Sequence, residues 1–209
     1  MKKYLTQNAK MAKMSGLKTF NWGIPAYQAK DGFKTCPWAG ACAVGCYARQ
    51  GAYVWSNVSQ AFEARLALSR SPRFVETIDA EIKRRKIKRL RIHDSGDFYS
   101  GKYRDDWFAI MRANPGTLFY AYTKAIPLFR TVQRPANFTL IFSEGGKLDK
   151  LINQTEMRHS RVFSSVDALK QAGYADASKD DSQATGPNHK IGLIYHGHKS
   201  RAWGTTKNV

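Results

Sequence analysis

The chain has 209 residues, 43% hydrophobic and 24% charged, and this composition indicates one folded domain with a substantial core and excludes a disordered chain. No apolar run approaches the ~20 residues that span a bilayer, and the first residues, MKKYLTQNAK, lack the apolar stretch of a secretory signal. We therefore expect a single cytoplasmic domain over residues 1–209 that does not contact a membrane. The odd number of cysteines argues against a disulfide framework.

The charge balance is strongly positive. Lys and Arg total 34 against 16 Asp and Glu, which gives a formal net charge of +18. A surface of this kind attracts polyanions through long-range fields and counterion release. A nucleic acid or a nucleotide is therefore the expected partner or substrate, although charge alone names no sequence and no chemistry.

The first predicted elements surround a long loop. Residues 18–24 predict a strand that ends at Pro25, and the following loop, rich in Gly and Pro, contains all three cysteines. Residues 58–69 have helical spacing, and Ser71 and Pro72 predict the start of a second helix, which ends in the basic run 83–86. That run either complements the negative end of the helix or belongs to a nucleic-acid-binding surface.

Strand and helix patterns alternate in the rest of the chain. The predicted strands are 89–93, 117–122, 138–142, 161–164 and 190–195, and the predicted helices are 103–112, 126–132, 148–157 and 166–172. Residues 174–189 are rich in Asp, Ser, Gly and Lys and predict a mobile loop. The alternation predicts an α/β fold, and we expect a partial (open) β/α barrel of about six mainly parallel strands. In such folds the loops after the carboxyl ends of the strands carry the active site.

The three cysteines, Cys36, Cys42 and Cys46, fall within eleven residues. Thiolates are soft ligands that suit iron–sulfur clusters and zinc. Gly40 and Gly45 let the backbone bend and bring N–H groups towards sulfur, and the small alanines leave room for an inorganic core. We therefore expect these cysteines to be metal ligands, with an iron–sulfur cluster preferred.

Two other interpretations of the cysteines remain open. A zinc site would need a fourth ligand, and the available histidines are His93, His159, His189, His196 and His198. The cysteines could also be buried without a ligand, since free cysteine packs as a small hydrophobe.

An acidic turn follows the predicted strand 89–93. The sequence His93-Asp94-Ser95-Gly96-Asp97 places an imidazole and two carboxylates around a glycine at the end of an apolar strand. Asp94 and Asp97 could act as a general base, ligate a metal or bind an ammonium group. Asp-Ser-Gly-Asp is also ordinary turn chemistry.

The third predicted strand ends in FYAYTKA. Tyr120, Tyr122 and Lys124 alternate to one face, so they could line a pocket, and an ordinary half-buried strand is the other interpretation.

The order of these features resembles the radical S-adenosylmethionine (SAM) enzymes, in which a strand, a three-cysteine loop and a helix precede a second strand ending in a Gly-Gly-Glu-like motif. The blocks CPWAGACAVGCYA, RIHDSGDFYS and FYAYTKA more closely resemble a family of uncharacterised bacteriophage gene products. The spacing here is C-x5-C-x3-C where the enzyme superfamily has C-x3-C-x2-C, and the turn carries Asp97 in place of Glu.

The resemblance implies a [4Fe–4S] cluster on the three cysteines, with SAM as a possible second cofactor. Ser95, Gly96 and Asp97 would then hold the methionine ammonium, His93, Tyr122 and Lys124 would line the cofactor site, and Asp94 and Asp97 would be catalytic. For a phage-encoded chain the expected location is the host cytoplasm.

Three functions follow as expectations. The first is a radical-SAM-like enzyme of unknown substrate. The second is a hydrolase or lyase that uses the open iron as a Lewis acid without SAM. The third is a non-enzymatic nucleic-acid-binding protein whose cluster is structural or redox-sensing.

Overall fold

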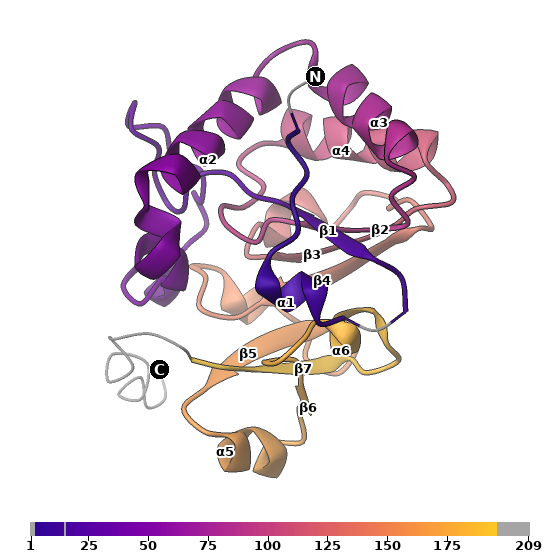
Figure 1. Ribbon diagram of the computed structural model, residues 1–209. Coiled ribbons are helices and arrows are strands. Elements are labelled where there is room, and N and C mark those ends of the chain that lie inside the picture. Colours follow the sequence, from indigo (N-terminus) through magenta and orange to yellow (C-terminus); the bar gives the residue numbers. More distant parts are fainter. Residues whose placement is uncertain (1–2, 15, 196–209) are drawn as a thin grey trace.

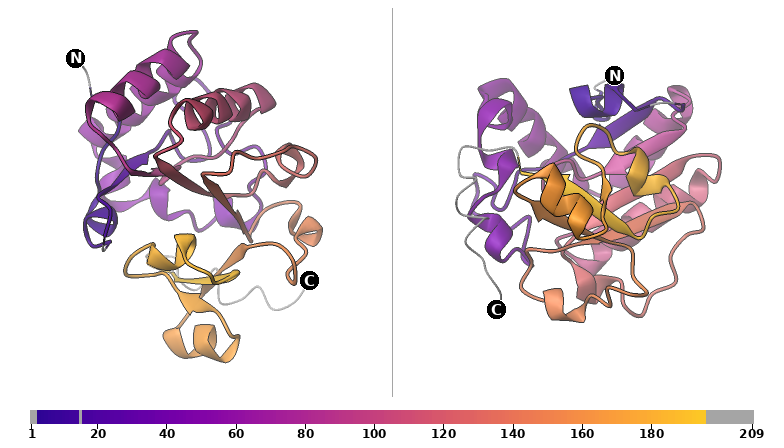
Figure 2. Two further views of the ribbon diagram at one scale, coloured as in Figure 1. Left: turned by 90° about the vertical axis from the view of Figure 1, so that its right-hand side faces the viewer. Right: turned by 90° about the horizontal axis from the view of Figure 1, so that it is seen from below.

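The computed structural model describes residues 3–14 and 16–195, and its centre is a seven-stranded sheet in which every pairing is parallel (Figure 1). The strand order is β1-β2-β3-β4-β5-β7-β6. The strands are β1 Thr19–Trp22, β2 Arg89–Ile92, β3 Leu118–Thr123, β4 Phe138–Ser143, β5 His159–Phe163, β6 Ala175–Asp176 and β7 Lys190–Ile194. The sheet is curled and open, so it forms a half-barrel (Figure 2). The predicted α/β partial barrel is confirmed, and the strand beyond the expected six is the two-residue β6.

The helices are α1 Ala9–Ala12, α2 Ser56–Ser69, α3 Phe74–Arg84, α4 Gly101–Ala113, α5 Val166–Gln171 and α6 Ser182–Thr185. α3 and α4 pack side by side over the outer face of the sheet (Figure 1). Their apolar side chains join the outward-facing residues of the strands in the main core, for example Ile92 and Phe142. The indole Nε1 of Trp22 donates to the hydroxyl of Tyr103, 2.8 Å away, and so ties β1 to α4.

The inner face of the half-barrel has a second, smaller core. Tyr120, Ile141 and Ile191 point inward from β3, β4 and β7. They pack against two methionines in and just after α1 and two alanines, one just after β6 and one in α6. This plug fills the half-barrel towards the amino ends of the strands. The carboxyl ends are left open, and that is where the predicted site lies.

Several predicted boundaries are wrong. Residues 126–132 and 148–157 were expected to be helices, but only the 3-10 turns Ile126–Leu128 and Asp149–Leu151 form. After the second of these turns, the Asn153 side chain accepts from both the N–H and the hydroxyl of Thr155, and such local bonds compete with a helix. α3 begins at Phe74, so Pro72 lies in the preceding turn and not at the first helical position.

The segment 174–189, expected to be a mobile loop, contains β6 and α6. Asp181 and Ala184 within it are fully buried, so the segment is part of the inner core. Its mobility stays a prediction. No helix within residues 3–14 and 16–195 is long and apolar enough to cross a membrane.

Candidate functional site

A cavity of about 800 Å³ opens at the carboxyl ends of the strands. It is lined by segments that are far apart in sequence, including the cysteine loop, the turn after β2 and the end of β3. All ten predicted site residues line it: Cys36, Cys42, Cys46, His93, Asp94, Ser95, Gly96, Asp97, Tyr122 and Lys124. The structure brings the acidic turn and the cysteine loop together at the carboxyl ends of the strands.

The cysteine loop is docked on the turn after β4. The backbone N–H groups of Gly40 and Cys42 both donate to the carbonyl of Gly145, at 3.1 and 3.0 Å. A Cβ atom on Gly40 would lie 2.8 Å from the backbone of Gly146, so this close approach requires glycine. The Lys147 ammonium donates to the Pro37 carbonyl, 2.9 Å away. These contacts position the first part of the cysteine loop, residues 37–42, relative to β4.

The three thiols are half-buried and form no disulfide. The Sγ atom of Cys36 accepts a hydrogen bond from the Tyr27 N–H at 3.3 Å. Burial, with a further contribution from the charge of Asp97, raises the pKa of Cys36 to about 12, and burial also raises the pKa of Cys46. Without a bound metal these two thiols are therefore protonated at neutral pH, and metal binding would release their protons.

A mononuclear zinc site has no support in the described part of the chain, where no three His, Cys, Asp or Glu side chains gather closely enough to hold one ion. His159 uses both ring nitrogens on the Met157 carbonyl and the Tyr174 hydroxyl. His196 and His198 lie outside the described residues. In a cluster each thiolate binds a different iron, so the sulfurs need not converge on one point.

The turn after β2 depends on Gly96, which has a φ of +81°. A Cβ atom there would lie 2.2 Å from Cγ1 of Ile24. Asp97 is held on the other side of the turn, because its Oδ1 accepts from the Thr123 hydroxyl at 2.6 Å and from the Phe98 N–H at 2.7 Å, and its Oδ2 accepts from the Lys124 N–H at 2.9 Å. Asp97 therefore fastens the turn to the end of β3. Burial raises its pKa, although these hydrogen bonds act in the opposite direction.

Asp94 is 5% exposed and lies where the turn meets β1. Its Oδ2 accepts from the side-chain amides of Asn21 and Asn8, at 2.7 and 3.3 Å, and burial raises its pKa. Its Oδ1 packs over Gly23, where a Cβ atom would come within 2.1 Å. The Tyr47 hydroxyl donates to the backbone carbonyl of Asp94 at 2.6 Å, which connects the cysteine loop to the turn.

His93 has a left-handed backbone, with a φ of +66°. Its Nε2 lies 3.0 Å from the Tyr103 hydroxyl, and its ring packs edge-on against Phe98. Burial, together with the charge of Arg91, lowers the pKa of His93 to about 3, so the ring is neutral. The neutral imidazole is held by these contacts in the wall of the cavity, where it supports the turn after β2.

The end of β3 supplies Tyr122 and Lys124. The Tyr122 hydroxyl is buried with no hydrogen-bond partner among residues 3–14 and 16–195, and the Arg91 guanidinium lies 5.2 Å from its ring centre. The Lys124 ammonium donates to the Ser143 hydroxyl, 3.0 Å away. Tyr120 lies on the same face but deeper, in the inner core.

Three cations of the cavity wall were not predicted from the sequence, namely Lys10, Arg65 and Arg91. Arg91 had a visible signal, since it alternates with the apolar Leu90 and Ile92 in β2 and so points to the opposite, inner face. Lys10 and Arg65 come from α1 and α2, and only the folded chain brings them to the cavity.

The chain is similar to known bacteriophage proteins. The family described as Gene product 88 matches residues 2–208. The Gene 88 protein of Mycobacterium phage L5 is 34% identical over 135 residues, which are 58% of this chain and 55% of that protein, so the match spans about half of the relative. No solved structure matches the chain. The expected kinship with a bacteriophage gene-product family is therefore confirmed, and the chain belongs to the Gene product 88 family.

Proposed function

We propose that this protein is an iron–sulfur enzyme, in which Cys36, Cys42 and Cys46 hold a [4Fe–4S] cluster and the adjoining cavity binds SAM. The observation that carries the proposal is that the three thiols of one short loop line the same cavity as the turn after β2. Both lie at the carboxyl edge of a half-barrel, where β/α barrels build their active sites.

The surroundings of the thiols suit a cluster bound by thiolates. Cys36 already accepts a backbone hydrogen bond, of the kind that stabilises thiolate charge. Burial by itself would lower the pKa of Lys124, but negative charge on Cys42, Asp97 and Cys36 raises it. The charge of Lys124 in turn acts to lower the pKa of Cys46, although burial outweighs it.

Cys36, Cys42 and Cys46 would hold the cluster, and the cluster, once reduced by a low-potential one-electron donor, would supply the electron for reductive cleavage of bound SAM. The protein would bind and orient SAM. Ser95, Gly96 and Asp97 would face the methionine ammonium, and the Tyr122 and Ser95 hydroxyls, which have no partner in the described structure, would hydrogen-bond the ligand.

Anaerobic reconstitution tests the cluster. We expect ~4 iron and ~4 sulfide per chain, with visible absorbance, and loss of both in Cys36→Ser, Cys42→Ser and Cys46→Ser. Ala43→Ser in the same loop is the matched control and should keep the cluster. Iron that survives all three cysteine substitutions, or stoichiometric zinc in its place, would sink the proposal.

SAM binding is tested on the reconstituted protein by calorimetric titration and by 5′-deoxyadenosine release under dithionite. If the cluster forms but neither is observed, the Lewis-acid hydrolase or lyase becomes the preferred function. The raised pKa values of the buried Asp94 and Asp97 favour a general base in that case. Asp97→Asn would then abolish turnover while leaving the cluster absorbance intact.

A basic groove at the amino ends of the strands supports nucleic acid as a partner or substrate. It has a volume of about 360 Å³ and lies at the amino ends of β1 and β2, lined by Lys18, Arg85, Lys86 and Lys88 with Leu17 and Phe20. If this groove binds a phosphate backbone, affinity for RNA or DNA should fall steeply with salt, and Lys86→Ala with Lys88→Ala should reduce the salt slope by ~2. Affinity that does not change with salt would contradict this role.

A further inference from the structure

One wall of the large cavity carries three cations, and two of them share a single carboxylate. The cationic wall consists of Lys10, Arg65 and Arg91, which line the cavity, together with two neighbouring carboxylates, Asp94 and Asp181. It joins α1, α2, β2 and the segment before α6, and it contains none of the cysteines.

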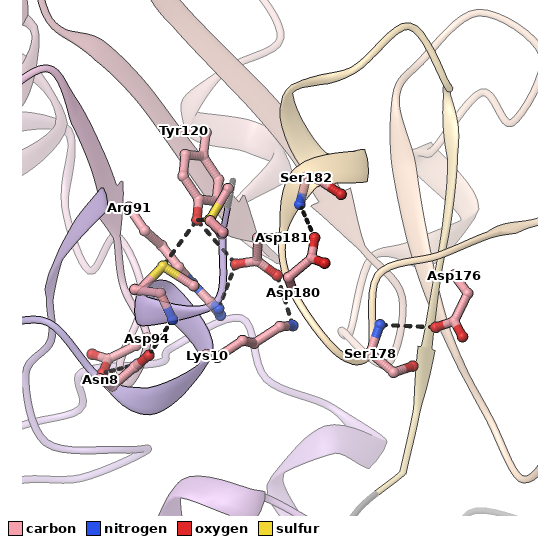
Figure 3. Close-up of polar contacts among 12 residues, drawn as sticks. Asn8, Lys10, Arg91, Asp94, Tyr120, Asp176, Ser178, Asp180, Asp181 and Ser182 are labelled. Atoms are coloured by element: carbon pink, nitrogen blue, oxygen red, sulfur yellow. Dashed lines mark hydrogen bonds and ion pairs between the residues drawn. The ribbon is translucent and has the colours of Figure 1, made fainter. Parts of the chain in front are cut away.

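Asp181 is fully engaged at the base of this wall (Figure 3). Its Oδ2 lies 2.7 Å from Nη1 of Arg91 and accepts from the Tyr120 hydroxyl at 3.0 Å. Its Oδ1 lies 2.6 Å from the Lys10 ammonium. Burial alone would raise the pKa of Asp181, but the charges of Arg91 and Lys10 lower it, so this carboxylate is ionised.

Asp94 is the second anion of the wall, and its direct partners are neutral. The amides of Asn21 and Asn8 hold its Oδ2, while Arg91 and Arg65 act on it only through their charge. Arg65 itself donates Nε to the Tyr4 carbonyl, 2.7 Å away. Glu81 acts on Arg65 and Asp180 acts on Lys10 through charge in the same way, so charge alone does not call for a bound ion.

A buried hydrogen-bond donor without a partner is costly, so it favours a ligand that supplies an acceptor. Arg91 is 8% exposed and its Nε–H has no hydrogen-bond partner among the described residues. The hydroxyl of Tyr122, whose ring lies against the Arg91 guanidinium, is also unsatisfied. Both groups are hydrogen-bond donors of residues that line the cavity, so they call for a ligand with acceptor oxygens.

We propose that the cationic wall binds the carboxylate of a second substrate, a small organic acid, through Arg91 and Lys10. A carboxylate has two acceptor oxygens that match the planar donor fork of arginine, and beside Asp94 and Asp181 it brings less negative charge than the roughly two charges of a phosphate monoester. That the acid is a substrate rests on the proposed function, but binding of an anion by the wall requires no cluster.

Anomalous scattering from protein crystals soaked in sodium bromide locates the anion directly. We expect a bromide peak within hydrogen-bond distance of Arg91 or Lys10, and planar density at the same place after a sodium formate soak. Bromide on the exposed basic surface serves as the internal control. Peaks on that surface with none in the cavity would overturn the proposal, and so would a site that takes phosphate but not formate.

Substitutions that change the local charge in opposite directions test the wall in solution. At constant ionic strength, with the formate dissociation constant measured from thermal stabilisation, Arg91→Met should weaken binding about tenfold or more. Asp181→Asn keeps an acceptor and removes the neutralising charge, so it should tighten binding. Lys102→Met, at an exposed position on α4, should change nothing.

If Arg91→Met fails to fold, the direction of the Asp181→Asn effect still decides, because loss of the neighbouring negative charge must tighten an anion held by Lys10 and Arg91, and unchanged or weaker binding contradicts the proposal. Formate binding without a cluster would sink the proposed function alone. A cluster that cleaves SAM in a protein with no anion at Arg91 would sink the cationic wall alone.

Discussion

At the scale of single residues, the turn after β2 depends on backbone geometry that few side chains tolerate. Gly96 and His93 both have positive φ angles, and Gly23 leaves the space in which the Asp94 carboxylate packs. Strained backbone conformations of this kind raise the free energy of the folded state, and they persist only where the surrounding contacts hold them. They orient the carboxylates that face the cavity.

Gly96→Ala should therefore destabilise the protein. The added Cβ combines a left-handed backbone with a clash against the Ile24 side chain, and we expect a loss of ~1–3 kcal/mol in the free energy of unfolding, measured by urea denaturation. Gly101→Ala is the matched control, since it begins α4 and its Cβ would meet nothing closer than 3.9 Å. Equal stability of the two variants would show that the turn is not constrained as described.

The neutral His93 should make the protein sensitive to acid. The pKa of His93 is lowered to about 3 in the folded state, whereas the pKa of a histidine in an unfolded chain is about 6.5. Between these values the unfolded chain binds more protons, so stability falls as the pH drops from about 6.5 towards 3.

His93→Asn removes this contribution and tolerates the left-handed backbone. It should flatten the pH dependence of the free energy of unfolding by a few kcal/mol, on the order expected for a buried group. His189→Asn, at an exposed position, is the control and should retain the wild-type slope. A wild-type slope in His93→Asn as well would contradict a buried neutral imidazole.

At the scale of elements, Tyr103 of α4 connects the outer core to the site. Its hydroxyl lies 2.8 Å from the Trp22 indole and 3.0 Å from the His93 ring, so one side chain serves β1 and the turn after β2. Tyr103→Phe would leave buried polar groups without partners and should cost ~1–3 kcal/mol in denaturant unfolding. Tyr99→Phe, which loses only contacts to Ser69 on α2, should cost less; the reverse order would contradict this role.

The elements also show what sequence reasoning could predict. Strand β2 was predictable because Leu90 and Ile92 alternate with arginines, and the ten site residues were found because they cluster in two short blocks and one strand end. α1, β6 and α6 are too short to have a periodic pattern, and their stability comes from contacts with the inner core. Lys10 and Arg65 contribute to the site through tertiary contacts, which no local pattern encodes.

At the scale of the whole molecule, an open half-barrel has two edges, and Asp181 joins the segments that carry them. α1 precedes edge strand β1, and α6 follows edge strand β6. The ion pairs of Asp181 with Lys10 and Arg91 hold α1 and the α6 segment together over the inner face. Ion pairs therefore hold α1 and the α6 segment in place, in addition to their apolar packing in the inner core.

Removing the ion pair between Lys10 and Asp181 should loosen α1 and α6 without unfolding the sheet. In Lys10→Met, Asp181 keeps Arg91, so we expect amide hydrogen exchange to rise in α1 and α6 while β2, β3 and the outer core keep their protection. Lys13→Met, exposed and adjacent to the same helix, should leave exchange unchanged. Faster exchange throughout the sheet would instead mean that the ion pair supports global stability. Unchanged exchange in α6 would mean that apolar packing alone holds α6 against the inner face of the sheet.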